Sequence, residues 1–106
     1  MGPKTAELCE RLRETSALLK RSGEFHWSAW LDASLDRIEN HDLSGVDHLL
    51  GAYGGMGSFN DLILTYVNGH TVPDVEVRSV NDRLDVLRSA MHELACEVRR
   101  DAEIVE

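Results

Sequence analysis

Residues 80–98, VNDRLDVLRSAMHELACEV, decide the fold. Their apolar side chains alternate spacings of four and three residues, which is the repeat of one face of an α-helix. The flanking Ala90 and Ala95 widen this face beyond the two-position seam of a coiled coil, as is typical of a helix in a bundle core. The stretch therefore predicts a long core-facing helix, whose apolar face consists of Val80, Leu84, Leu87, Met91, Leu94 and Val98.

Two earlier segments also have helical spacing. Residues 4–22 carry apolar positions on one face, and Gly23 follows where a left-handed residue would end the helix. Residues 24–40 place Trp27 and Trp30 on one apolar face, for which core packing is the simple interpretation and a partner contact is the alternative. Both segments are predicted helices.

The middle of the chain has mixed signals. Ser44 followed by Asp47 resembles a helix-start signal and predicts a short third helix. That helix runs into a glycine-rich segment, where a sharp turn is expected. Residues 59–67 begin like a helix but are rich in strand formers. We favour a helix there, with a short strand at 62–67 as the alternative.

The length and composition fit one globular domain. The chain has 106 residues, of which 42% are hydrophobic and 28% are charged. That length supports one modest core, and no apolar run approaches the roughly 20 residues of a membrane helix. We therefore predict an all-α protein, a compact four- to five-helix bundle with a glycine-rich turn, in a single helical domain over residues 1–106. Because its start lacks an export signal, we expect a cytoplasmic protein with Cys9 and Cys96 as reduced thiols.

The charge is acidic and uneven. The chain carries 19 acids and 11 bases, for a net charge of −8. Residues 24–61 hold seven acids against one base, and no lysine or arginine lies between Arg37 and Arg78. Binding to nucleic acid draws on clustered bases, so this balance argues against a nucleic-acid partner and favours a cationic protein partner.

The second predicted helix carries an acidic ridge. Its members Asp32, Asp36 and Glu39 fall at i, i+4 and i+7, which places them along one face. A solvated surface is the simple interpretation, and a docking surface for a basic partner is the sharper one. On the sharper interpretation, the predicted partner-binding residues are Asp32, Asp36, Glu39, Asp42 and Asp47.

The glycine-rich segment has a composition that needs an explanation. It lacks the lysine of a Walker loop and the third glycine of the dinucleotide fingerprint, which argues against a phosphate cradle. The simple interpretation is a turn whose glycines take positive φ and whose Ser58 caps the next element. A contact with a ligand or a partner is the alternative. The residues concerned are Gly54, Gly55, Gly57, Ser58, Asn60 and Asp61.

No motif predicts catalysis, a metal or a cofactor. The five histidines lack the spacing that brings two metal ligands onto one helical face. The nearest cluster, around His41 and His48, straddles a loop and a helix start. A nucleophile such as Ser58 needs a base beside it, and sequence separation does not supply one. We therefore predict no catalytic residue, no metal ligand and no cofactor.

Several segments together resemble a family of small bacterial proteins of unknown function. They are Phe25-His26-Trp27 with Trp30-Leu31, Asp42-Leu43-Ser44-Gly45, and Gly54-Gly55-Met56-Gly57-Ser58-Phe59-Asn60-Asp61-Leu62. The pattern Leu84-Asp85-Val86-Leu87-Arg88 belongs to the same resemblance, which covers roughly residues 8–100. The resemblance implies a bacterial cytoplasmic protein and brings no known activity, substrate or catalytic residue.

These observations lead us to expect a non-catalytic, acidic protein-interaction module, such as an immunity-type or antitoxin-like inhibitor of a basic partner. The comparison with immunity proteins rests on size and charge. Two alternatives stay open. One is a homodimeric structural or regulatory domain, whose self-interface is the apolar face of residues 80–98 with the aromatic residues of the second helix. The other is a small-molecule binder that uses the glycine-rich turn.

Overall fold

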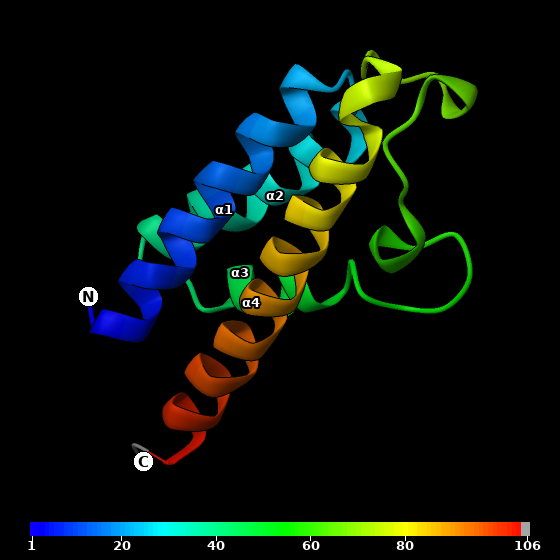
Figure 1. Ribbon diagram of the computed structural model, residues 1–106. Coiled ribbons are helices and arrows are strands. Elements are labelled where there is room, and N and C mark those ends of the chain that lie inside the picture. Colours follow the sequence, from blue (N-terminus) through cyan, green and yellow to red (C-terminus); the bar gives the residue numbers. More distant parts are fainter. Residues whose placement is uncertain (105–106) are drawn as a thin grey trace.

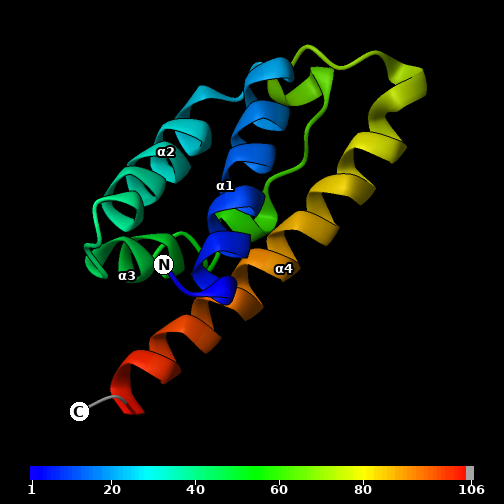
Figure 2. The same ribbon diagram turned by 90° about the vertical axis from the view of Figure 1, so that its left-hand side faces the viewer.

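Three long helices form the frame of the protein. The computed structural model describes the backbone of residues 1–104 and the side chains of residues 1–102. Within that part of the chain, the α-helices are α1 (Pro3–Arg21), α2 (Phe25–Glu39), α3 (Ser44–Leu50) and α4 (Val77–Ile104). Figure 1 and Figure 2 show α1 packed against α2 on one side and α4 on the other, with α3 against α2 and α4. The prediction of an all-α bundle is confirmed, with four α-helices and no strand among residues 1–104.

The two helices before residue 40 match their predicted ranges closely. The helix α1 ends at Arg21, and Gly23 after it takes a φ of 78°, so the predicted left-handed end is confirmed. The start of α2 is capped by Glu24, whose Oε2 accepts a hydrogen bond from the Trp27 amide at 3.0 Å. Across the described residues, no helix is both long and apolar enough to cross a membrane.

The core lies between the three long helices. Leu84, Leu87, Met91 and Val98 of the predicted apolar face are buried, and the other two members of that face are partly buried against them. Each fully buried leucine or methionine stabilises the fold by about 1.5–3 kcal/mol relative to an exposed side chain. Both cysteines are free thiols, as predicted.

The contact between α2 and α3 depends on Gly45. A Cβ at this position would lie 2.6 Å from the Ser34 carbonyl oxygen and 2.8 Å from Ile38 Cγ1, so only glycine fits without movement of the helices. The predicted short third helix is confirmed and begins at Ser44, whose amide donates to Asp42 Oδ1 at 3.0 Å.

Residues 51–76 form a long connection between α3 and α4, which runs along the outside of the frame (Figure 1). We call it the 51–76 connection. The predicted glycine-rich turn forms, but it leads into this connection instead of directly into a new α-helix. The connection contains the short 3-10 helices η1 (Phe59–Asp61), η2 (Tyr66–Asn68) and η3 (Asp74–Glu76).

The favoured helix over residues 59–67 is therefore wrong beyond its first turn, and the alternative strand at 62–67 does not form either. Leu62 and Thr65 take extended backbone angles, which fits the strand formers in this stretch. The partner of this stretch, however, is a side chain. Asn81 of α4 accepts from the Leu64 amide and donates to the Leu64 carbonyl, each at 2.8 Å. One asparagine thus satisfies backbone groups that a neighbouring strand would otherwise satisfy.

Candidate functional site

The acidic ridge of α2 is largely neutralised by bases of α1. Asp32 accepts a hydrogen bond from Ser16 Oγ at 2.6 Å and pairs with Lys20 Nζ at 2.8 Å. Burial by itself would raise the pKa of Asp32, but the contacts from Lys20 and Ser16 outweigh it and lower the pKa. Glu39 pairs with Arg13 at 2.6 Å. Two of the three ridge carboxylates therefore belong to the α1–α2 contact.

Asp36 forms no ion pair with any described residue, and its carboxylate accepts a hydrogen bond from Asn40 Nδ2 at 3.5 Å. It is the ridge member with charge left for a partner. Charge reversal at Asp32 or Glu39 would instead place a lysine against a base of α1. The full ridge therefore does not act as a surface independent of the fold.

The other two predicted partner-binding acids lie at α3. Asp42 is exposed, and hydrogen bonds from the hydroxyl and amide of Ser44 lower the pKa of its carboxyl group. Asp47 pairs with Arg99 of α4. Of the five predicted acids, three thus pair with bases of this chain, and Asp42 accepts a hydrogen bond from the first residue of α3.

The glycine-rich segment is a turn held by its own polar groups. Gly57 takes a φ of 80°, and its amide donates to Asp61 Oδ2 at 2.8 Å. Ser58 Oγ accepts from the Asn60 amide at 3.3 Å and caps η1. Gly55 also has positive φ, so the predicted turn chemistry is confirmed at Gly55, Gly57 and Ser58.

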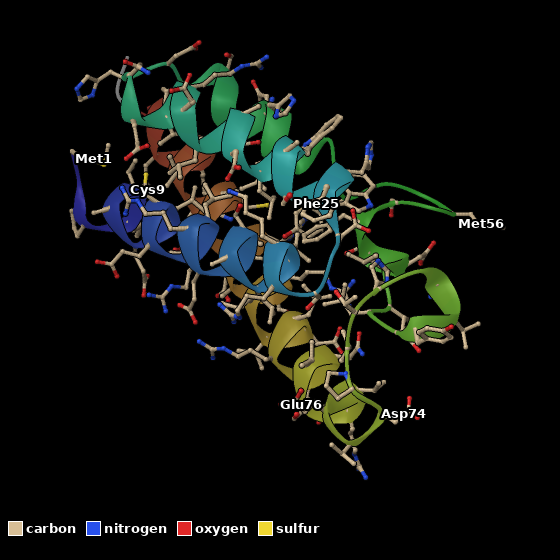
Figure 3. The ribbon with its side chains drawn as sticks, turned by 90° about the horizontal axis from the view of Figure 1, so that it is seen from above. Met1, Cys9, Phe25, Met56, Asp74 and Glu76 are labelled. Atoms are coloured by element: carbon tan, nitrogen blue, oxygen red, sulfur yellow. The ribbon has the colours of Figure 1, made fainter. Side chains whose placement is uncertain are left out.

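The turn projects away from the frame. A Cβ at Gly54 would meet nothing within 4 Å, and neither would one at Gly57. Met56 between them is fully exposed and stands at the outer edge of the molecule (Figure 3). The turn is therefore open to solvent, and a ligand or a partner could reach it.

Arg88 of α4, which is not among the predicted site residues, anchors the connection. Its Nη1 donates to the Phe59 carbonyl at 2.7 Å and to the Leu62 carbonyl at 2.9 Å, and its Nη2 bonds Asp85. The Tyr53 hydroxyl donates to the backbone carbonyl of Arg88 at 2.8 Å, and burial raises the pKa of that hydroxyl. The sequence does contain a sign of this role. Arg88 falls four residues after Leu84, which places a charged side chain on the apolar face of the helix.

A partly buried Glu24–His70 pair ties the end of the connection to the start of α2. His70 Nδ1 accepts from the Thr65 amide at 3.2 Å, so Nε2 carries the proton and donates to Glu24 Oε1 at 3.0 Å. Burial would raise the pKa of Glu24, but hydrogen bonds from the Trp27 amide and from His70 outweigh it and lower the pKa. Both nitrogens of His70 are therefore used in holding the fold.

A hollow of about 250 Å³ lies between the start of α2 and the 51–76 connection. Its walls carry both carboxylates and apolar side chains. The residues that line it include Glu24, Gly57, Asp61, Ile63, Asn68 and His70.

Two histidines lie beside hydroxyl or thiol groups. Ser34 Oγ is 2.7 Å from His48 Nδ1, but Ser34 has no exposed surface through which a substrate could reach it. Burial and then the charge of Arg37 lower the pKa of His48. On α4, Cys96 Sγ lies 3.9 Å from His92 Nδ1. Among the described residues, no group of three His, Cys, Asp or Glu side chains is placed to hold a metal ion.

The two tryptophans of α2 pack within the chain, whereas Phe25 at the start of the helix is exposed. Trp27 lies against Trp30 and Phe59, with ring centroids 5.7 Å and 5.6 Å away. Trp30 stacks on His48 and donates its indole N–H to the His48 carbonyl at 2.8 Å. Together with the buried face of α4, these contacts use most of the side chains that the homodimer alternative assigned to a self-interface, and Phe25 is the exposed exception.

Comparisons with known proteins add a family. A family model described as Domain of unknown function (DUF6966) matches residues 20–73, just over half of the chain. Neither a curated protein nor a solved structure gives a significant match. The two ends of the matched segment lie together, because the Thr71 amide donates to the Ser22 carbonyl at 3.0 Å beside the Glu24–His70 pair. The match thus covers α2, α3 and most of the connection, and it excludes α4.

Proposed function

Because the chain belongs to the family Domain of unknown function (DUF6966), whose description names no activity, we propose from its charge and geometry that it is a non-catalytic protein-interaction module. It binds a cationic protein partner, as an immunity-type or antitoxin-like inhibitor does. The proposal sets it in a bacterial cytoplasm, in line with the resemblance of its motifs.

The observation that carries the proposal is a run of carboxylates without a base. Residues 38–77 contain six acids and no lysine or arginine. Glu39 and Asp47 pair with bases from α1 and α4. The other four form no ion pair within the described part of the chain, and they are Asp42, Asp61, Asp74 and Glu76. A cationic surface on a partner would neutralise this field, and opposite charges speed association.

Several polar groups that a catalytic mechanism would need are engaged in the fold. Ser34 is buried beside His48, and His70 uses both ring nitrogens. The guanidinium of Arg88 bonds two backbone carbonyls and a carboxylate. These contacts support binding over catalysis.

The test is to cross-link the protein to its partner in the native host, to identify that partner and to produce it recombinantly. Titration calorimetry should then show a 1:1 complex with a basic protein. Its affinity should fall by about tenfold or more as salt is raised from roughly 0.05 M to 0.5 M, because screening shortens electrostatic reach. An identified partner that binds equally well at both salt concentrations would contradict the proposal.

A further inference from the structure

We propose that the 51–76 connection and the start of α2 form the docking surface of this protein, and that its occupant is a partner segment with both basic and apolar side chains. This inference rests on the proposed function and states where the partner binds. We define the docking surface by its exposed apolar residues, which are Phe25, Met56, Ile63, Tyr66 and Val67.

These five side chains are exposed by between 55% and 101%. Single exposed apolar residues are ordinary, but four of these five fall within residues 56–67. Figure 3 shows Phe25 at the end of α2 that faces the connection, and Met56 at the connection's outer edge. Such a concentration is typical of a surface that another molecule covers.

The hollow between the start of α2 and the 51–76 connection lies among the segments that carry these side chains. Ile63 lines it directly, and three others are next in sequence to residues that line it. Those three are Phe25 beside Glu24, Met56 beside Gly57, and Val67 beside Asn68. A side chain of the partner can therefore enter the hollow while its neighbours cover the exposed apolar residues.

The backbone groups of Leu64 and Thr65 are already hydrogen-bonded within the chain, so a partner must be recognised through side-chain contacts. The Leu64 amide and carbonyl are both bonded to Asn81, and the Thr65 amide is bonded to His70. The Thr65 carbonyl accepts from the amides of Asn68 and His70 at 3.0 and 3.1 Å. An added strand would find these groups already occupied, so docking by strand addition is disfavoured and side-chain contacts must supply the affinity.

The charge around the docking surface selects a basic occupant. Asp61 lines the hollow, and Asp74 and Glu76 lie where the connection enters α4 (Figure 3). None of these three carboxylates forms an ion pair with the rest of the described chain, in contrast to Asp32 and Glu39 on the α2 ridge. The same carboxylates would repel an anionic membrane, so a protein segment fits better than a lipid surface.

The test uses a fluorescent leucine–lysine peptide as a probe, with a leucine–glutamate peptide as its charge control. The protein should bind the lysine peptide at least about tenfold more tightly than the glutamate peptide. The variant Met56→Ser/Ile63→Ser/Val67→Ser should weaken that binding about tenfold, because it removes apolar contacts around the hollow. The matched control is Leu43→Ser/Val86→Ser, which alters exposed apolar residues on other elements and should change binding less than about twofold.

Thermal melting establishes that each variant is folded, and Met56→Ser alone provides a second variant at a fully exposed position.

Amide chemical shifts of the protein should move around residues 56–68 when the lysine peptide is added. Shifts confined to residues 32–39 would overturn the inference and leave the proposed function standing. Saturable binding to phosphatidylglycerol vesicles without binding to the peptide would replace the protein segment by a membrane. No binding to either probe would overturn the inference, and the salt titration with the captured partner would decide the proposed function separately.

Discussion

The helical frame and the 51–76 connection differ in how far directed hydrogen bonds hold them in place. The frame buries leucines of α1, α2 and α4 against one another, and apolar burial has no preferred direction. The connection buries only Ala52, Phe59, Leu64 and Val72 in that core, and its backbone and His70 are held by directed hydrogen bonds with Asn81, Arg88 and Glu24. Because these bonds satisfy its backbone from the side of the frame, the connection can turn apolar side chains outward. Most of the buried core and most of the exposed apolar side chains therefore lie in separate regions of the protein.

The largest expected effect lies in the frame. Leu87 is 2% exposed, so Leu87→Ala should lower the free energy of unfolding by about 2–5 kcal/mol, because it removes buried methyl groups and leaves a cavity. Chemical denaturation measures this loss. Val86→Ala is the matched control, because Val86 is the preceding residue of the same helix and is exposed. Equal losses for the two variants would show that burial at this face of α4 does not hold the frame.

A smaller loss of stability is expected when Arg88, the anchor of the connection, is replaced, because this change removes hydrogen bonds instead of apolar burial. Arg88→Met keeps most of the side-chain length but leaves the carbonyls of Phe59 and Leu62 without their charged donor, which should cost about 1.5–3 kcal/mol. Hydrogen exchange should also quicken at residues 59–65 more than in α1. The exposed Arg78→Met is the control and should change little. Uniform quickening across the whole chain would mean that Arg88 supports the frame as much as the connection.

The same contrast explains what could be predicted of the fold. The repeat from Leu84 to Val98 is enough to predict α4, because burial requires only that apolar residues recur on one face. The predicted helix over residues 59–67 is wrong beyond its first turn, and their strand formers do not find a neighbouring strand. The Leu64 amide and carbonyl are instead bonded to the side chain of Asn81, which is 17 residues later in the sequence. Gly45 likewise looks ordinary in the sequence, and its need for a bare backbone arises from the Ser34 carbonyl of another helix.

The candidate site was predictable in its charge but not in its position. Helical spacing places Asp32, Asp36 and Glu39 on one face of α2, and the structure keeps them there. Spacing does not reveal that Lys20 and Arg13 of α1 stand opposite two of them. The exposure of the connection's apolar residues also depends on contacts far apart in sequence. The sequence therefore predicts the excess of acidic residues in the middle of the chain. It does not predict which of these carboxylates form ion pairs within the chain and which do not.

The smallest expected effect separates backbone strain from contact within the glycine-rich turn. Gly57 has a φ of 80°, a conformation that costs an alanine about 1–2 kcal/mol, so Gly57→Ala should destabilise the protein by about that amount. Gly54 lies outside the positive-φ region and faces the same open space, so Gly54→Ala should be neutral or should stabilise by up to about 1 kcal/mol through the unfolded chain. Denaturation of the two variants side by side measures the difference, and neither methyl group meets another atom that would confuse it. If both variants are neutral, the turn is not held by its backbone geometry, and contact with a partner becomes the better explanation of its glycines.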